Sequence, residues 1–354
     1  MSIKRLDCGS AINGKVLAEG CKHCIQGSKM VLLVTGRCET GCFYCPVSAE
    51  KKGKDVVYAN EKKVLSPEEI IAEAESMDAT GTGITGGDPL GVMDRTLDMI
   101  KLLKGRFGPE HHIHLYTSMI DPEKAVLLEK AGLDEIRFHP SPSVWGNMEK
   151  TRLKEVIDRV HIDVGIEVPA IPGMALELDA LIKYAVSVGV KFINLNELEF
   201  SESNWDIMES HGFRIKDETS SAILGSEDLA IELMKNNRKA PIHFCSSVFK
   251  DGVQLRNRLI RRANHIAKEY DIVTEDGTLL KGLVYSDDLD AAAKLLREEY
   301  DVTDELMYID KQKKRMEVAS WVLEELAKDL PFKCYIVEEY STADRLEVER
   351  TPLN

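Results

Sequence analysis

Short apolar runs alternate with longer amphipathic stretches over roughly the first two hundred residues of the chain. The runs are apolar enough to be covered on both faces, as strands of a parallel sheet are. The expected strands are Val31–Thr35, Gly81–Thr85, Ile113–Thr117, Glu135–His139, Val164–Ala170 and Phe192–Asn196.

Helical segments are expected between these strands, near residues 66–78, 92–104, 122–131, 147–160 and 176–188. The first begins at Ser66-Pro67-Glu68-Glu69, which places Ser at the N-cap, Pro at N1 and acids in the first turn. Strands joined by crossover helices form a parallel sheet. The pattern therefore predicts an α/β fold with a partial (β/α)6 barrel of the TIM type.

The pattern changes after about residue 200, and we expect four parts in all. A cysteine-containing segment, 1–30, precedes the barrel, 31–200. The stretch 201–270 extends the barrel with a strand-like run at 241–245 and a basic helix from about 251 to 269. Residues 271–354 form a small α+β part, with a hairpin around 275–277, helices near 287–299 and 311–329, and a last strand at 334–337.

Charge disfavours a nucleic-acid partner. The 354 residues carry a net charge of −14, and residues 271–354 hold 21 acidic against 11 basic residues. Such a field repels a phosphate backbone. The exception is the basic helix, which is either a solvated surface or a grip on an anionic substrate; its cations are Arg256, Arg258, Arg261, Arg262 and Lys268.

The eight cysteines suggest thiols held for metal rather than disulfides. The sequence shows no apolar leader after Met1 and no apolar run of membrane length. We therefore expect a protein of the reducing cytoplasm, without a membrane partner.

Polar residues follow the expected strands where each one ends. Reacting groups of such barrels gather at the carboxyl ends of the strands. Here those ends carry Thr85-Gly86-Gly87-Asp88-Pro89, Thr117-Ser118, His139, Glu167 and Asn194–Glu197. We expect a functional pocket at this rim.

Three cysteines, Cys38, Cys42 and Cys45, follow the first strand with the spacing C-x3-C-x2-C, and Tyr44 precedes the third. Three thiolates leave one iron of a 4Fe-4S cube without a protein ligand, so that a small molecule can bind it. A zinc turn, or a cube completed by a distant cysteine, is the alternative. Together with Gly86-Gly87-Asp88-Pro89, the loop resembles the radical S-adenosylmethionine (radical SAM) superfamily over about residues 31–200, in particular uncharacterised proteins related to the pyruvate formate-lyase activating enzyme.

The resemblance implies that Cys38, Cys42 and Cys45 hold a 4Fe-4S cluster that binds S-adenosylmethionine (SAM). Gly86 and Gly87 would approach the methionine moiety. Asp88 stands where many relatives have Glu, so its contact with the cofactor is in doubt. The other residues implied at the cofactor or substrate are Tyr44, Thr117, Ser118, His139 and Glu167, with His139 equally a histidine satisfied in a turn.

The implied activity is that of an oxidoreductase or activase. An electron from a donor such as flavodoxin or ferredoxin cleaves SAM, and the 5′-deoxyadenosyl radical takes hydrogen from a small molecule, a peptide or a protein. No catalytic side chain is identified. The alternatives are a radical SAM enzyme that modifies RNA through the basic helix, and a non-catalytic iron-sulfur electron carrier.

Four further cysteines suggest a second metal site. Cys21 and Cys24, in Cys-Lys-His-Cys-Ile-Gln-Gly, fit a tight turn of two thiolates, and Cys8 and Cys245 are the best candidates for the remaining ligands. Four thiolates favour zinc over a second iron-sulfur cluster. Buried free thiols are the alternative, and we place Cys334 in that class.

Overall fold

A computed structural model describes residues 3–14 and 17–354. The chain divides into two compact units, residues up to Ala74 with Ala79–Leu255, and Glu75–Asp78 with Arg256–Asn354. The second unit begins at Arg256, whereas the sequence placed the start of the C-terminal part at residue 271. The basic helix therefore belongs to the second unit.

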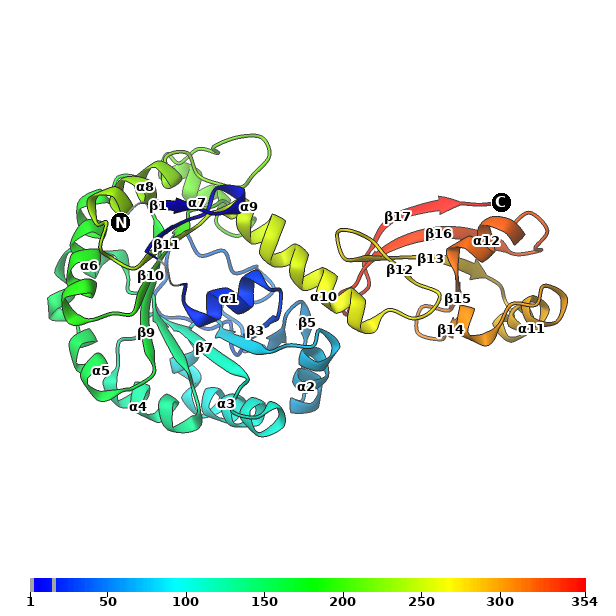
Figure 1. Ribbon diagram of the computed structural model, residues 1–354, viewed down its shortest axis with the longest axis horizontal. Coiled ribbons are helices and arrows are strands. Elements are labelled where there is room, and N and C mark those ends of the chain that lie inside the picture. Colours follow the sequence, from blue (N-terminus) through cyan, green and yellow to red (C-terminus); the bar gives the residue numbers. More distant parts are fainter. Residues whose placement is uncertain (1–2, 15–16) are drawn as a thin grey trace. The chain divides into compact units, whose positions relative to one another are not determined.

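In the described residues, the first unit is built on an eleven-stranded sheet with seven parallel strands at its centre (Figure 1). All six expected strands are present within two residues of their expected ends, and β11 continues the parallel series. In their order across the sheet, β3, β6, β7, β8, β9, β10 and β11 span Lys29–Leu33, Gly81–Thr85, His112–Thr117, Glu135–Phe138, Asp163–Ala170, Phe192–Glu197 and Ile242–Cys245.

Antiparallel strands extend both edges of this sheet. β4 (Tyr58–Ala59) and β5 (Lys62–Lys63) follow β3, while β2 (Ala11–Asn13) pairs with β11 and β1 (Ile3–Arg5) pairs with β2. The end strands β1 and β5 are not paired with each other, so the described strands form an open α/β sheet.

Helices connect the parallel strands and lie along the outer side of the curved sheet (Figure 1). They are α2 (Pro67–Ser76), α3 (Met93–Phe107), α4 (Pro122–Ala131), α5 (Leu153–Arg159), α6 (Ala175–Val188) and α8 (Ser226–Asn236). The short helix α7 (Trp205–Ser210) lies beside the cysteine loop, where His211 stacks on Phe43. α4 shows why they end where they do. Asp121 accepts the Lys124 N–H at 2.9 Å, and Gly132, at φ 107, takes the left-handed conformation after the last turn.

Cys21 and Cys24 lie on a helix, α1 (Glu19–Ile25), and not on the tight turn that the sequence suggested. α1 packs on β3, β6 and β7. A β carbon at Gly20 would lie 2.5 Å from the His114 ring and 2.6 Å from the Arg137 guanidinium. Only glycine allows the helix to come this close to the inner face of the sheet.

Short helical turns complete the first unit. They are the 3-10 turns η1 (Asp7–Gly9), η2 (Pro89–Val92) and η3 (Pro142–Lys150), the helix α9 (Ser247–Phe249) and the π-helical turn η4 (Lys250–Leu255).

The second unit is a six-stranded antiparallel sheet whose apolar core is shared with the helices α11 (Leu289–Glu299) and α12 (Ser320–Leu326). β14 (Met307–Asp310), β15 (Arg315–Val318), β13 (Thr278–Tyr285), β16 (Lys333–Tyr340) and β17 (Glu347–Pro352) lie in this order, and β12 (Ile272–Val273) pairs with β13. Helix α10 (Arg256–Ile266) and the turn η5 (Asp304–Leu306) complete it. The apolar core includes Val284, Leu296, Val318 and Leu323.

The sequence-based elements of this part were partly wrong. The hairpin at 275–277 and the helix near 287–299 are confirmed. The expected helix 311–329 is instead the strand β15 followed by α12, and β17 was missed.

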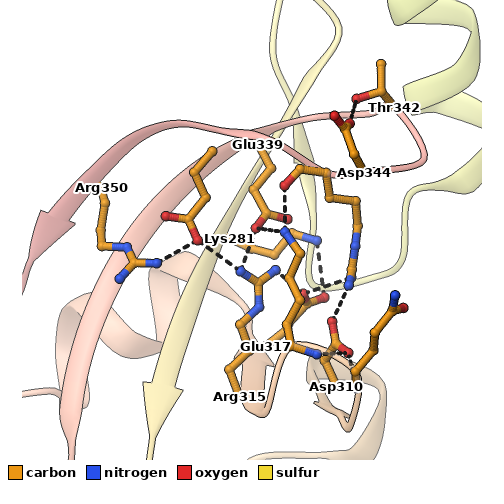
Figure 2. A network of polar contacts seen from close by, with 12 residues as sticks. Lys281, Asp310, Arg315, Glu317, Glu339, Thr342, Asp344 and Arg350 are labelled. Atoms are coloured by element: carbon orange, nitrogen blue, oxygen red, sulfur yellow. Dashed lines mark hydrogen bonds and ion pairs between the residues drawn. The ribbon is translucent and has the colours of Figure 1, made fainter. Parts of the chain in front are cut away.

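Buried charges explain the error over β15. Arg315 and Glu317 alternate with the core residues Met316 and Val318, so each charge points away from the apolar core. Figure 2 shows their partners on other strands of the sheet: Arg315 pairs with Glu339 of β16 at 2.6 Å, and Lys281 of β13 pairs with Glu317 at 3.2 Å. Neither ion pair can be inferred from the hydrophobic pattern of residues 311–329 alone, because each partner lies on another strand.

The basic helix is largely engaged within its own unit. Arg256 pairs with Asp276 at 3.0 Å, Arg261 pairs with Asp78, and Arg262 is buried and donates to the Ser341 carbonyl. These contacts leave little of the cationic face for an anionic substrate. In the described part of the chain, no helix combines the length and the apolar character needed to span a membrane.

Candidate functional site

A cavity of about 630 Å³ lies in the first unit, at the carboxyl ends of the parallel strands. Of the eight residues that the sequence analysis assigned to the cofactor or substrate, all but Asp88 line it, as do the three loop thiols. Its lining includes Cys38, Cys42, Tyr44, Cys45, Gly86, Gly87, Thr117, Ser118, His139 and Glu167. The rim pocket expected from the strand ends is present.

The cysteine loop forms one wall of this cavity. Cys38 is exposed, whereas Cys42 and Cys45 are half-buried. Gly41, at φ 63, provides the left-handed turn between Cys38 and Cys42. Burial raises the pKa of the Cys42 thiol. Within residues 3–14 and 17–354, no three His, Cys, Asp or Glu side chains are grouped as a ready metal site. The fit to an iron-sulfur cluster therefore rests on three thiols of one loop that share one cavity wall.

Gly86 and Gly87 bring the end of β6 against the cysteine loop. A β carbon at Gly86 would lie 2.5 Å from the Thr35 carbonyl oxygen, and one at Gly87 would lie 2.0 Å from the Arg37 carbonyl oxygen. The Gly87 N–H donates to the Thr35 carbonyl at 2.7 Å. Both glycines also line the cavity, so they serve loop packing as well as the expected approach to a ligand.

Asp88 locks the neighbouring strand ends together instead of lining the cavity. It is buried, and it accepts from the Thr117 hydroxyl at 2.7 Å and from the Ser118 N–H and hydroxyl at 2.9 and 2.5 Å. A fourth donor, the Leu90 N–H, lies 3.0 Å away. Since both carboxylate oxygens are already engaged, Asp88 is a positioning residue in this structure.

His139 is fixed as a neutral ring. Its Nδ1–H donates to the Glu167 carbonyl at 2.7 Å, and its Nε2 accepts from the Tyr44 hydroxyl at 2.9 Å. Burial lowers its pKa below the ordinary histidine value. This chain of contacts holds Tyr44 of the cysteine loop against strands β8 and β9.

The floor of the cavity is polar, and it joins Glu167 and the asparagines that the sequence analysis placed at the strand ends to Arg137, which was not among the candidate site residues. Glu167 accepts from Arg137 at 2.7 Å, from Asn194 at 2.8 Å and from Asn196 at 3.0 Å. Burial opposes its ionisation, but Arg137 and the two amides outweigh burial and lower the pKa of Glu167 to about 2. Glu167 is therefore a carboxylate at neutral pH.

The register of the parallel strands is the information that would have predicted these contacts. Tyr116 lies opposite Arg137, and Glu167 opposite Asn194, so their side chains meet on the inner face of the sheet. Below them, both ring nitrogens of the buried His114 have no hydrogen-bond partner in the described residues. The inner face is thus lined by polar groups with unused hydrogen-bonding capacity.

A second ion pair stands at the rim. Lys250 pairs with Glu199, which also accepts from the Ser247 hydroxyl at 2.9 Å. Burial opposes the charge of Lys250, yet Glu199 raises its pKa above the ordinary value.

Of the further cysteines, Cys8 is exposed, Cys24 is half-buried, and Cys21 and Cys245 are buried. None of them lines the cavity. Cys334 is buried in the core of the second unit.

Comparison with known proteins places this site in a family. The model of the radical SAM superfamily matches residues 32–141, and a domain of unknown function, DUF8061, matches residues 277–353. A protein of Methanocaldococcus jannaschii named "Putative glycyl-radical enzyme activating enzyme" is 40% identical over 371 residues, covering 100% of this chain and 97% of its own length.

Two further matches, one to a protein sequence and one to a solved structure, cover less of the chain. Biotin synthase of Idiomarina loihiensis is 29% identical over 159 residues, 41% of this chain and 44% of its own. The structure of the FeFe-hydrogenase maturase HydG from Carboxydothermus hydrogenoformans is 16% identical with a TM-score of 0.36, covering 62% of this chain and 58% of its own. Because the chain matches the Methanocaldococcus jannaschii relative over its full length and also matches the family model, it belongs to the radical SAM superfamily and is an enzyme.

Proposed function

We propose that the first unit is an activating enzyme that takes hydrogen from a residue of a partner protein, and that its open sheet works as a partial barrel around the reaction. The single observation that carries this is the cavity that joins three loop thiols, two glycines and a polar floor. The name of the full-length relative supports a protein substrate, with a glycine residue as the site of hydrogen loss.

In this proposal Cys38, Cys42 and Cys45 would hold a 4Fe-4S cluster, with SAM beside Gly86 and Gly87. When bound, these groups supply the reductive cleavage of SAM that yields a hydrogen-abstracting radical. Flavodoxin or ferredoxin fits as the reductant.

The chain's own residues position and shield this chemistry. Asp88 fixes Thr117 and Ser118, which line the cavity, by two hydroxyl hydrogen bonds. His139 and Tyr44 hold the loop beside the floor. Glu167 presents a fixed carboxylate there, because Arg137 neutralises its charge and two amides orient it. The enclosing walls would exclude water and stray hydrogen donors.

The cavity and the engaged arginines argue against the two alternatives. An electron carrier needs no cavity beside its cluster. An RNA-modifying enzyme needs free cations, whereas Arg256, Arg261 and Arg262 are bound within the second unit.

The test is reductive SAM cleavage by the whole chain, reconstituted with iron and sulfide without oxygen and reduced with dithionite. We expect 5′-deoxyadenosine from the native chain, none from Cys42→Ala, and normal yield from Cys334→Ala, which removes a cysteine of the second unit's core. A chain that holds its cluster but does not bind SAM would refute the proposal.

A further inference from the structure

Four cysteines outside the radical SAM loop surround one turn of the first unit. Cys8 lies on η1, Cys21 and Cys24 on α1, and Cys245 at the end of β11. Both η1 and α1 pack next to the π-helical turn η4 or the helix α9 that leads into it. Segments more than two hundred residues apart in the sequence therefore place their thiols on elements that pack beside one another.

Gln254 of this turn touches two of the thiols at once. The Cys24 thiol donates to the Gln254 side-chain oxygen at 2.8 Å, and the Gln254 amide nitrogen donates to the Cys245 sulfur at 3.3 Å. One planar amide thus separates two sulfur atoms, and this amide is the group that keeps them apart.

The other two thiols lie near this pair. Cys21 is one helical turn before Cys24, and its sulfur accepts from the Asn194 amide at 3.3 Å and from the Arg137 guanidinium at 3.5 Å. The Cys8 sulfur lies beside η4, where a β carbon at Gly252 would meet it at 3.7 Å.

These surroundings do not suit buried free thiols. A cysteine used as a small hydrophobe is packed by apolar groups. Here three of the four sulfur atoms instead meet amide or guanidinium groups. A disulfide between Cys24 and Cys245 is blocked by the Gln254 amide.

We propose that Cys8, Cys21, Cys24 and Cys245 bind a thiophilic metal centre, a zinc ion or an iron-sulfur cluster, and that the Gln254 side chain leaves when it binds. Zinc holds sulfur atoms at about 2.3 Å, so two sulfur ligands are about 3.8 Å apart and leave no room for the amide. Each thiol that binds releases its proton to solvent, and the cations nearby offset the negative charge of the bound thiolates.

The centre would join the N-terminal segment to the end of the parallel sheet. Cys8 and α1 would be tied to β11 and η4, next to Lys250 at the rim of the cavity. The proposal does not depend on the proposed activity, since none of its four ligands lines the cavity.

The experiment measures metal in a chain that lacks the radical SAM motif. The variant Cys38→Ser/Cys42→Ser/Cys45→Ser is purified without oxygen, and its zinc, iron and sulfide are counted per chain. Cys24→Ser/Cys245→Ser is then added, with Cys334→Ser as the matched control in the same background. Cobalt(II) is titrated into each metal-free protein to detect sulfur-to-cobalt charge transfer.

We expect the loop variant to hold one zinc ion, or one iron-sulfur cluster, per chain. The added Cys24→Ser/Cys245→Ser pair should remove this metal and the cobalt absorption, whereas Cys334→Ser and Gln254→Ala should keep both. A loop variant that is folded but has neither metal nor thiolate-bound cobalt would overturn the proposal.

If the loop variant does not fold, the intact chain gives the same answer. The metal content of the native chain minus that of Cys24→Ser/Cys245→Ser should then equal one zinc ion or one cluster. A difference of zero refutes the site, and a loop that fails to bind SAM does not affect the result.

Discussion

Gly87→Ala is the sharpest test of how the site is built. The new β carbon would lie 2.0 Å from the Arg37 carbonyl oxygen and 2.3 Å from the Arg37 carbonyl carbon. Both are backbone atoms, so no side chain can rotate away. Because such contacts are not found below about 3 Å, the cysteine loop must move by about 1 Å.

The size of the effect follows from this movement. The shift strains two backbone hydrogen bonds, Gly87 N–H to Thr35 at 2.7 Å and Asp88 N–H to Arg37 at 2.9 Å, each worth about 1 kcal/mol. It also displaces Cys38, the next residue of the loop. A misplacement of about 1 Å costs roughly a hundredfold in rate, and we expect that loss in kcat/KM for SAM cleavage.

The assay compares Gly87→Ala with Gly91→Ala in cleavage rate, SAM affinity and melting temperature. Gly91 lies in η2, four residues further on, and its added β carbon would meet nothing within 4 Å. The control should behave like the native chain. Cleavage by Gly87→Ala within threefold of native, at an unchanged melting temperature, would refute the reasoning.

Three further predictions concern buried charges. Asp88→Ala should lower the unfolding free energy by about 3 to 5 kcal/mol in urea titration, because four donors lose a buried acceptor; a loss below 1 kcal/mol would contradict the geometry. Glu317→Ala leaves Arg315, Lys281 and Arg345 without this carboxylate, so the same titration should show an unfolding free energy lower by about 3 to 5 kcal/mol. The control, Asp158→Ala, removes an exposed partner and should lower it by less than about 1 kcal/mol. Burial lowers the pKa of His111 from 6.5 to about 4. As the pH falls, this side chain therefore takes up a proton in the unfolded chain before it does so in the folded one, and the unfolding free energy should fall by up to about 3 kcal/mol between pH 6.5 and 4. His111→Gln should flatten that part of the stability curve, and an unchanged slope would show that other groups produce it.

The parallel strands and the cysteine loop could be predicted because each is encoded within a few consecutive residues. Gly81–Thr85 and Glu135–Phe138 are near their expected bounds, and Gly86 and Gly87 follow the strand as a motif. The helix α1 was not expected, because a C-x2-C spacing fits a turn and a helix alike. What selected the helix is the close contact of Gly20 with the sheet.

The ion pairs of the polar floor and the full order of the C-terminal sheet could not be predicted, since both depend on partners distant in the chain. Arg137 and Glu167 come together only through the register of β8 and β9. Arg315 and Glu317 resemble a solvated surface until β13 and β16 supply Lys281 and Glu339. Asp88 was expected at the cofactor, but it does not line the cavity and instead binds Thr117 and Ser118 at the end of the next strand.

The pairing of β2 with β11 bears on how the chain is synthesised. Ile12 lies opposite His243, so β2, which pairs with β1 on its other edge, waits some 230 residues of synthesis for its second partner. Closing so long a loop is slow, and an unpaired strand edge is exposed meanwhile. The segment with Cys8 must then dock last. The first unit can mature only once β11 has emerged, and any metal held by both Cys8 and Cys245 would be bound only after that point.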